Sequence, residues 1–214
     1  NTLSLIGDSI DTVSLSDVAT NWHYLGEIAG SGGLNGYNFK QYQYKPGSVA
    51  VGDEQVTLNI QTELTSTIGE YYRGWDGNDG LKVFSMNFDG IEGGAGTDTI
   101  RVDSANQDYT QAGIAAKINN IEVIDGNGHS GATTLTVDSS VISAVTNANN
   151  QLTLLGESGI DHVILQETTN WNYYGEVTAF GETLYQYKSL DNSSTLNVQK
   201  NLATTPGVFF NGDN

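Results

Sequence analysis

The sequence contains an internal duplication, and this feature constrains the fold most. Residues 1–15 (NTLSLIGDSIDTVSL) parallel residues 150–165 (NQLTLLGESGIDHVIL). A duplication with gaps predicts one supersecondary unit used twice. Three further pairs of segments follow in the same order: 20–27 with 169–176, 42–45 with 185–188, and 57–61 with 195–199.

Within each copy, apolar and polar residues alternate as they do in half-buried strands. Leu3 and Leu5 alternate with polar residues, and the pattern resumes after Gly7-Asp8. This period of two predicts strands, and the Gly-Asp and Gly156-Glu157 pairs predict hairpin turns between them. We therefore expect an all-β, β-sandwich-like domain with duplicated four-strand units, one or two short helices and metal-bound loops.

The segment between the two copies has a different character. We divide the single module into a first β-unit at 1–62, an insert at 63–147, a second β-unit at 148–202 and a C-terminal tail at 203–214. Strands are expected in the insert at 83–88, 100–102, 121–125 and 133–137. A short helix is expected at 111–118 and a helical turn at 141–145.

Composition excludes several classes of partner. The chain has 25 Asp and Glu against 8 Lys and Arg, a formal net charge of -17. Nucleic acids and anionic membranes both require a basic surface, so neither is an expected partner. There is no cysteine, which excludes disulfides and thiolate metal sites, and no apolar run long enough to insert into a membrane. The chain starts at Asn1 without Met, so we expect a monomeric module of a longer protein.

The segment Gly93-Gly94-Ala95-Gly96-Thr97-Asp98 reads as a calcium loop. Glycines let the backbone aim carbonyl oxygens at one point, and an aspartate adds a hard anionic oxygen. A loop that occurs once is not expected to build a roll, so we expect one clasp at a strand junction. The candidate metal ligands in and around it are Asp89, Glu92, Gly94, Gly96, Asp98, Asp103, Glu122 and Asp125.

A second acidic loop, residues 75–80 (WDGNDG), adds Asp76 and Asp79 as metal candidates. It contains part of an EF-hand-type pattern but lacks that loop's spacing and closing glutamate. The alternative interpretation is that its Asp and Asn side chains only cap turns.

The same loop is the candidate ligand site. An arginine among aromatic residues and beside carboxylates can bind an anionic group, and the alternative is a surface Arg–Asp pair. By contrast, Trp22/Tyr24 and Trp171/Tyr173 occupy duplicated positions and are expected to pack in cores. The candidate ligand-binding residues are Tyr72, Arg73, Trp75, Asp76 and Asp79.

The sequence predicts no enzyme. Residues 7–10 (GDSI) resemble the nucleophile block of GDSL-type esterases, but the duplicate reads Gly156-Glu157-Ser158, as expected of a turn. The three histidines lie in unrelated contexts, without a His-Glu-x-x-His zinc helix.

The run at 90–100 (GIEGGAGTDTI), with 120–125 (NIEVID) and 152–157 (LTLLGE), resembles modules of giant RTX adhesins of Gram-negative bacteria. The spelling Gly-Gly-x-Gly-x-Asp occurs in the calcium-binding repeats of RTX proteins. Among such modules, the chain is most similar to the calcium-dependent peptide-binding domains.

The resemblance implies a calcium-dependent adhesion module on the bacterial cell surface, with several Ca²⁺ ions. Its partner would be the free C-terminus of a protein on a host or neighbouring cell, with Ca²⁺ helping to hold the carboxylate. Two alternatives stay open: a calcium-rigidified structural extender of a large adhesin, and a calcium-dependent carbohydrate-binding domain.

Overall fold

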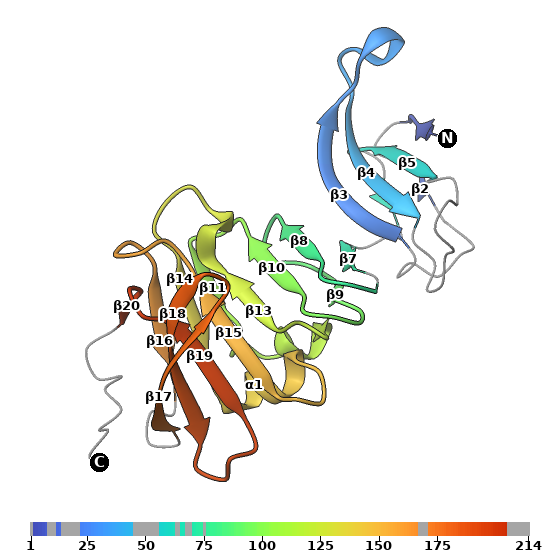
Figure 1. The fold of residues 1–214 in the computed structure, drawn as a ribbon. Coiled ribbons are helices and arrows are strands. Elements are labelled where there is room, and N and C mark those ends of the chain that lie inside the picture. Colours follow the sequence, from blue (N-terminus) through green and yellow to red (C-terminus); the bar gives the residue numbers. More distant parts are fainter. Residues whose placement is uncertain are drawn as a thin grey trace. The chain divides into compact units, whose positions relative to one another are not determined.

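The computed structural model divides into two compact units (Figure 1). The first unit comprises Asn1–Arg73 and Asn87–Ile91, and the second comprises Gly74–Met86 and Glu92–Asn214. The described residues are 2–7, 12–13, 22–44, 56–62, 65–66, 70–74, 76–166 and 171–204. Each unit is considered by itself below.

The first unit is built on a mixed four-stranded sheet with the order β1-β5-β4-β3. β1 runs parallel to β5, whereas β4 is antiparallel to both of its neighbours. The hairpin of β3 and β4 carries a bulge between Tyr24 and Gly26. The elements are β1 (Thr2–Leu5), β2 (Thr12–Val13), β3 (Trp22–Ala29), η2 (Gly32–Leu34), β4 (Asn38–Tyr44), β5 (Thr57–Gln61), β6 (Thr65–Ser66) and β7 (Tyr71–Arg73).

The second unit contains a seven-stranded sheet with the order β17-β18-β19-β15-β13-β10-β8. Strands β8, β10, β13, β15 and β19 are parallel. β17 and β18 form an antiparallel hairpin at one end of the sheet, and β18 pairs antiparallel with β19. The strands are β8 (Gly80–Val83), β10 (Thr99–Val102), β13 (Val123–Asp125), β15 (Gln151–Leu155), β17 (Trp171–Ala179), β18 (Glu182–Ser189) and β19 (Thr195–Gln199).

A second, fully parallel sheet has the order β11-β14-β16-β20. Its strands are β11 (Asn106–Asp108), β14 (Thr134–Val137), β16 (His162–Leu165) and β20 (Ala203–Thr204). β9 (Gly90–Glu92) lies where the chain passes between the units, and β12 (Ile118–Asn119) precedes β13.

The chain therefore winds in stacked coils, because β10, β13, β15 and β19 of the large sheet are followed by β11, β14, β16 and β20 of the other. The largely β class is confirmed, with mixed and parallel sheets; sandwich packing of the duplicated units stays a prediction. The hairpin predicted at Gly156-Glu157 is wrong, since β15 and β16 belong to different sheets. Alternation with period two is common to parallel and antiparallel strands, so it could not distinguish them.

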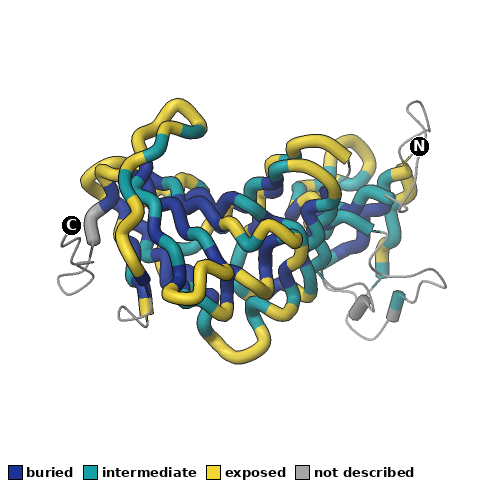
Figure 2. Tube along the Cα trace, turned by 60° about the horizontal axis from the view of Figure 1, so that its bottom comes forward, coloured by how far each residue is buried: buried dark blue, intermediate teal, exposed yellow. Residues whose placement is uncertain are grey.

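Buried aliphatic side chains fill the coils. Figure 2 marks the buried residues in dark blue along the chain trace. Ile100, Val102, Leu135 and Leu154 are all fully buried. The predicted helical turn at 141–145 is confirmed as α1 (Ser139–Val145), which is capped by Asp138 through a 2.9 Å bond from the Val141 amide.

Two local predictions in the insert are wrong. The strand expected at 83–88 ends at Val83, where β8 stops. The helix expected at 111–118 is a turn followed by one short 3₁₀ segment, η3 (Ala115–Lys117). Its sequence begins Gln-Ala-Gly, and glycine weakens a helix interior. A further 3₁₀ segment, η4 (Gly126–Gly128), follows β13.

The duplication recurs in three dimensions. Asn59 accepts a 3.0 Å bond from Gln41 Nε2, and Asn197 accepts a 3.1 Å bond from Gln186 Nε2. Likewise the Gly7 and Gly156 amides donate to the side chains of Gln61 and Gln199 at 3.1 and 3.0 Å. Two copies of the same polar contacts establish one repeated unit.

These contacts correct one detail of the sequence alignment. Because Gln41 and Gln186 occupy the same place, Tyr42 of β4 corresponds to Tyr187 of β18, not to Tyr185. Both segments contain Tyr-Gln-Tyr, and matching these identical residues shifts the alignment by two. A shift of two residues keeps each side chain on the same face of its strand, so the alternation does not reveal it.

Candidate metal centre

Three turns stack beside one another where the second unit begins. The Gly74 amide donates to Glu92 O at 2.7 Å, and the Gly93 amide donates to Asn119 O at 3.0 Å. Between the first two turns, the Gly77 amide donates to Ala95 O at 2.6 Å. The turns are thus Gly74–Asp79, Gly93–Asp98 and 119–122, one in each successive coil.

The second acidic loop is therefore another copy of the glycine loop. GWDGND and GGAGTD share two glycines and the final aspartate, and these aspartates lie 19 residues apart. Glycine backbones with positive φ shape both turns: 108° at Gly77 and 144° at Gly96. The glycine loop therefore does not occur only once, and its turn has a stacked neighbour on each side. The calcium clasp expected at this strand junction stays a prediction.

In the second and third turns, one carboxylate accepts a hydrogen bond from the backbone of the turn before it. The Asp79 amide donates to Asp98 Oδ1 at 2.8 Å, and the Asp98 amide donates to Glu122 Oε2 at 2.9 Å. Asp98 is fully buried and Glu122 is half-buried. Asp79, Asp98 and Glu122, named here the carboxylate series, are thus aligned by the parallel stacking of the coils.

Each bond of the series uses only one oxygen of the accepting carboxylate. Among the residues that the structure describes, Asp98 Oδ2 and Glu122 Oε1 are buried without a hydrogen-bond partner. A buried anionic oxygen without a partner is costly. Burial accordingly raises the pKa of Asp98; the bond from the Asp79 amide opposes this, and the charge of Glu122 adds to it.

The glycines at the head of the turns let oxygen donors approach the backbone closely. A Cβ at Gly93 would lie 2.7 Å from Asp98 Oδ2 and would collide with the carbonyl oxygen of Asn120. A Cβ at Gly74 would lie 2.9 Å from Asp79 Oδ2 and would collide with the carbonyl oxygen of Gly93. In both turns, one carboxylate oxygen and one carbonyl oxygen thus lie against the glycine and close to each other.

This donor set fits a hard divalent cation. Ca²⁺ takes six to eight oxygens from carboxylates, backbone carbonyls and waters. Asp98 Oδ2, Glu122 Oε1 and the Asn120 carbonyl are the candidate ligands at the second turn. Within the described residues, no group of three or more His, Asp or Glu side chains could hold a metal by side chains alone. Backbone carbonyls would have to complete the shell.

A turn elsewhere in the second unit has the same Gly-x-x-Gly-x-Asp pattern and provides a contrast. In Gly156–Asp161 (GESGID), the aspartate is also buried beneath its glycine. Both of its oxygens are bonded, Oδ1 by the Thr133 amide at 2.8 Å and Oδ2 by the Glu157 amide at 2.6 Å. Asp161 is therefore a structural aspartate, whereas Asp98 retains an unused oxygen.

The other predicted metal ligands do not join the carboxylate series. Asp103 contacts His129 Nδ1 at 3.2 Å, and buried Asp125 pairs with Arg101 Nε at 2.7 Å. Asp89 belongs to the first unit, where it accepts the Glu70 amide at 2.8 Å. Glu92 accepts a 2.7 Å bond from Asn120 Nδ2, beside the second turn. Gly94 has φ 106°, so its contribution is to the shape of the turn.

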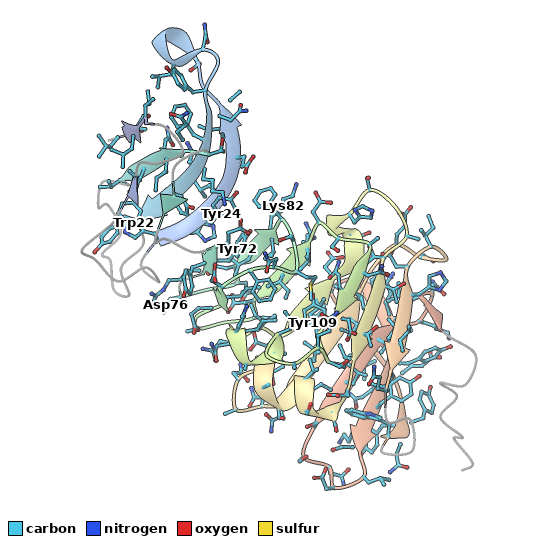
Figure 3. The ribbon with its side chains drawn as sticks, turned by 180° about the vertical axis from the view of Figure 1, so that it is seen from behind. Trp22, Tyr24, Tyr72, Asp76, Lys82 and Tyr109 are labelled. Carbon is cyan, nitrogen blue, oxygen red and sulfur yellow. The ribbon has the colours of Figure 1, made fainter. Side chains whose placement is uncertain are left out.

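The predicted ligand site is only partly available. Tyr72 is wrong as a ligand platform: it is 1 % exposed, and its ring lies 5.9 Å from that of Tyr24 (Figure 3). The Arg73 amide donates to His23 Nδ1 at 2.8 Å. Asp76 is exposed, Asp79 is half-buried, and Trp75 lies outside the described residues.

Sequence reasoning missed the carbonyls of Gly93 and Asn120. The signal for Asn120 is an asparagine with φ 53°, a backbone conformation that asparagine tolerates better than most residues. Glycines at Gly74 and Gly93 are a second signal, since they mark a close approach of another backbone.

Comparison with known proteins identifies no relative: no protein-family model, curated protein or solved structure matches the chain. In the described part of the chain, no helix has the length and apolarity needed to cross a membrane.

Proposed function

We propose that the turn stack binds Ca²⁺ and that the chain is a calcium-dependent adhesion module of a bacterial surface protein. The observation that carries this proposal is the pair of buried, unpartnered oxygens, Asp98 Oδ2 and Glu122 Oε1. A bound cation would neutralise both, and it would relieve repulsion in a chain of net charge -17.

The residues have distinct roles in this proposal. Asp98 and Glu122 would supply anionic ligands, and the Asn120 carbonyl would supply a neutral one. Gly93 would let these oxygens approach one another, because any side chain there would collide with the Asn120 carbonyl. Calcium supplies positive charge and cross-links neighbouring coils when bound.

Ligand binding would use the first turn, where Asp76 is exposed and Asp79 is half-buried. A cation held at that edge would keep coordination positions open to solvent, and these would accept the carboxylate of a peptide C-terminus. Without such an ion, this acidic surface would repel a carboxylate. Short peptides with free C-termini are therefore the proposed ligands.

Binding of a C-terminal peptide library, measured with Ca²⁺ and with EDTA, tests the adhesion role. We expect binding with Ca²⁺ that EDTA abolishes and that C-terminal amidation of the peptide weakens. A parallel glycan array tests the carbohydrate alternative. If neither the peptide library nor the glycan array shows binding with Ca²⁺ present, the ligand-binding role is overturned.

The second candidate is a calcium-rigidified extender. It is favoured by the complete burial of Asp98, because an ion bound there would have few positions for an outside ligand. An extender would show calcium-dependent thermal stability without any ligand. Replacement Asp76→Asn separates the two, since it should weaken peptide binding and leave the calcium-dependent stability nearly unchanged.

A further inference from the structure

The hairpin of β17 and β18 presents a tyrosine face that its counterpart in the first unit keeps covered. The rings of Tyr24 and Tyr42 lie 5.3 Å apart, and those of the equivalent Tyr173 and Tyr187 lie 5.7 Å apart. Yet Tyr24 is 4 % exposed and Tyr173 is 37 % exposed. The two faces share their chemistry and differ in their cover.

The cover in the first unit is β7. The Tyr72 ring lies 5.9 Å from Tyr24 and 6.0 Å from His23, in edge-on geometry in both cases. The Arg73 amide fixes this contact by donating to His23 Nδ1 at 2.8 Å. An aromatic side chain and one backbone amide thus close the tyrosine face.

The strand register shows which residues stand at the place of β7 in the second copy. Thr12 pairs with Thr65 in the first copy, and His162 pairs with Ala203 in the second. Asp11 and Asp161 precede the paired residues in the duplicated sequences, so Ala203 corresponds to Thr65. Counting onward without a gap places Phe210 at the position of Tyr72.

The sequences agree along this count. Residues 65–74 read TSTIGEYYRG and residues 203–212 read ATTPGVFFNG. They share a threonine, a glycine, two consecutive aromatic residues and a second glycine. The position of His23 is held by Asn172, whose amide oxygen can accept a backbone N–H as His23 Nδ1 does.

We propose that the tyrosine face of β17 and β18 binds the chain's own segment 205–212, with Phe210 against Tyr173. The duplicated unit then includes this aromatic segment and ends at Gly74 in one copy and Gly212 in the other. The segment 203–214, taken from the sequence as a tail, becomes part of the second copy. The proposal does not depend on calcium.

Cross-linking tests the contact, because the chain has no cysteine of its own. A double variant, Tyr173→Cys with Phe210→Cys, is treated with a short bis-maleimide. Tyr24→Cys with Tyr72→Cys is the positive control, and Tyr173→Cys with Val208→Cys is the register control, since Val208 stands at the place of Glu70. We expect an intramolecular cross-link in the first two proteins and a much lower yield in the third.

Cross-linked dimers in place of monomers would assign the face to a second copy and overturn the proposal. A cross-link in the positive control alone would overturn it as well.

A second measurement avoids replacing Tyr173. Tyrosine nitration, mapped by mass spectrometry, reports how accessible Tyr173 is in the otherwise native chain. We expect Phe210→Ala to increase nitration of Tyr173 several-fold. Val208→Ala should leave nitration of Tyr173 unchanged, and nitration of Tyr24 should be the same in all three proteins. Equal nitration of Tyr173 in the wild type and Phe210→Ala would overturn the proposal.

Discussion

At the scale of single residues, two buried aspartates that end the same Gly-x-x-Gly-x-Asp pattern differ in the number of hydrogen bonds they accept. Asp161 accepts two backbone amides, whereas Asp98 accepts one and leaves Oδ2 without a partner. The difference lies within the turn: each aspartate accepts one amide from a neighbouring coil, but only Asp161 also accepts an amide of its own turn, that of Glu157. It separates an aspartate that only stabilises a turn from one that can hold a cation.

Replacement Asp98→Asn should affect stability differently without and with Ca²⁺. In EDTA the variant should unfold at the same temperature as the wild type or higher, because it removes an uncompensated buried charge. With Ca²⁺ it should lose most of the increase in Tm, which for one site at 100 times Kd corresponds to about 2.7 kcal/mol.

Asp161→Asn is the matched control. It should lower the free energy of unfolding by about 1–3 kcal/mol with and without Ca²⁺, because an amide cannot accept both N–H groups. Thermal melts of the two variants in Ca²⁺ and in EDTA provide the comparison. Equal calcium effects in both variants would contradict the assignment of Asp98.

The pH dependence of stability should reverse its sign with calcium. The pKa of Asp98 is raised in the folded state, so without Ca²⁺ its contribution to stability grows as pH falls through that raised pKa. This contribution is complete below about pH 3.9, the unfolded value. With Ca²⁺, acid displaces the ion and stability falls instead. The difference in Tm between wild type and Asp98→Asn isolates this group at each pH.

Gly93 should not tolerate a side chain. In Gly93→Ala the new Cβ would meet the carbonyl oxygen of Asn120, and we expect a loss of about 2–4 kcal/mol in the free energy of unfolding. Gly80→Ala is the control, because nothing lies within 4 Å of its Cβ position. Urea titration measures both, and the control should stay within about 0.5 kcal/mol of the wild type.

At the scale of elements, the repeated unit is held by polar side chains inside the sheet. Asn197 is 2 % exposed and joins Gln186 of β18 to Thr153 of β15 at 3.1 and 3.4 Å. Asn59 joins Gln41 of β4 to Ser4 of β1 at 3.0 and 3.2 Å. One asparagine thus links an antiparallel and a parallel neighbour.

Asn197→Ala should destabilise the second unit by about 1–3 kcal/mol, because it leaves the buried partners of the side chain unsatisfied. Denaturant unfolding of the variant checks the value. Glu182→Ala, at an exposed position of β18 in the same sheet, should change little. A neutral effect of Asn197→Ala would show that the bonds are not a structural requirement of the sheet.

The sequence could predict the elements that depend on local pattern. The duplication, the strands at 100–102 and 133–137, the turn of helix at 141–145 and the turn character of the glycine loops all follow from short-range rules. Parallel stacking could not be predicted, because its partners are 19 and 24 residues apart at successive turns. Uneven spacing hides the repeat, and glutamate replaces aspartate at its third member, Glu122.

At the scale of the whole molecule, a net charge of -17 makes cations a determinant of stability. Added NaCl should stabilise the protein modestly by screening. Ca²⁺ at equal ionic strength should raise Tm further, and Mg²⁺ should do less, because it demands octahedral geometry and retains its waters. Calorimetry in the three salts checks this order. Equal effects of Ca²⁺ and Mg²⁺ would indicate general screening in place of a site.

The spacing of the coils also predicts the order of folding. Contacts between Asp79, Asp98 and Glu122 close loops of 19 and 24 residues, whereas the contact of Gly156 with Gln199 spans 43 residues. Short loops cost less entropy to close and form faster. The coils around the carboxylate series are thus expected to assemble before the Gly156–Gln199 contact between β15 and β19 forms. The β17–β18 hairpin, whose strands meet at Ala179 and Glu182, can form locally by itself.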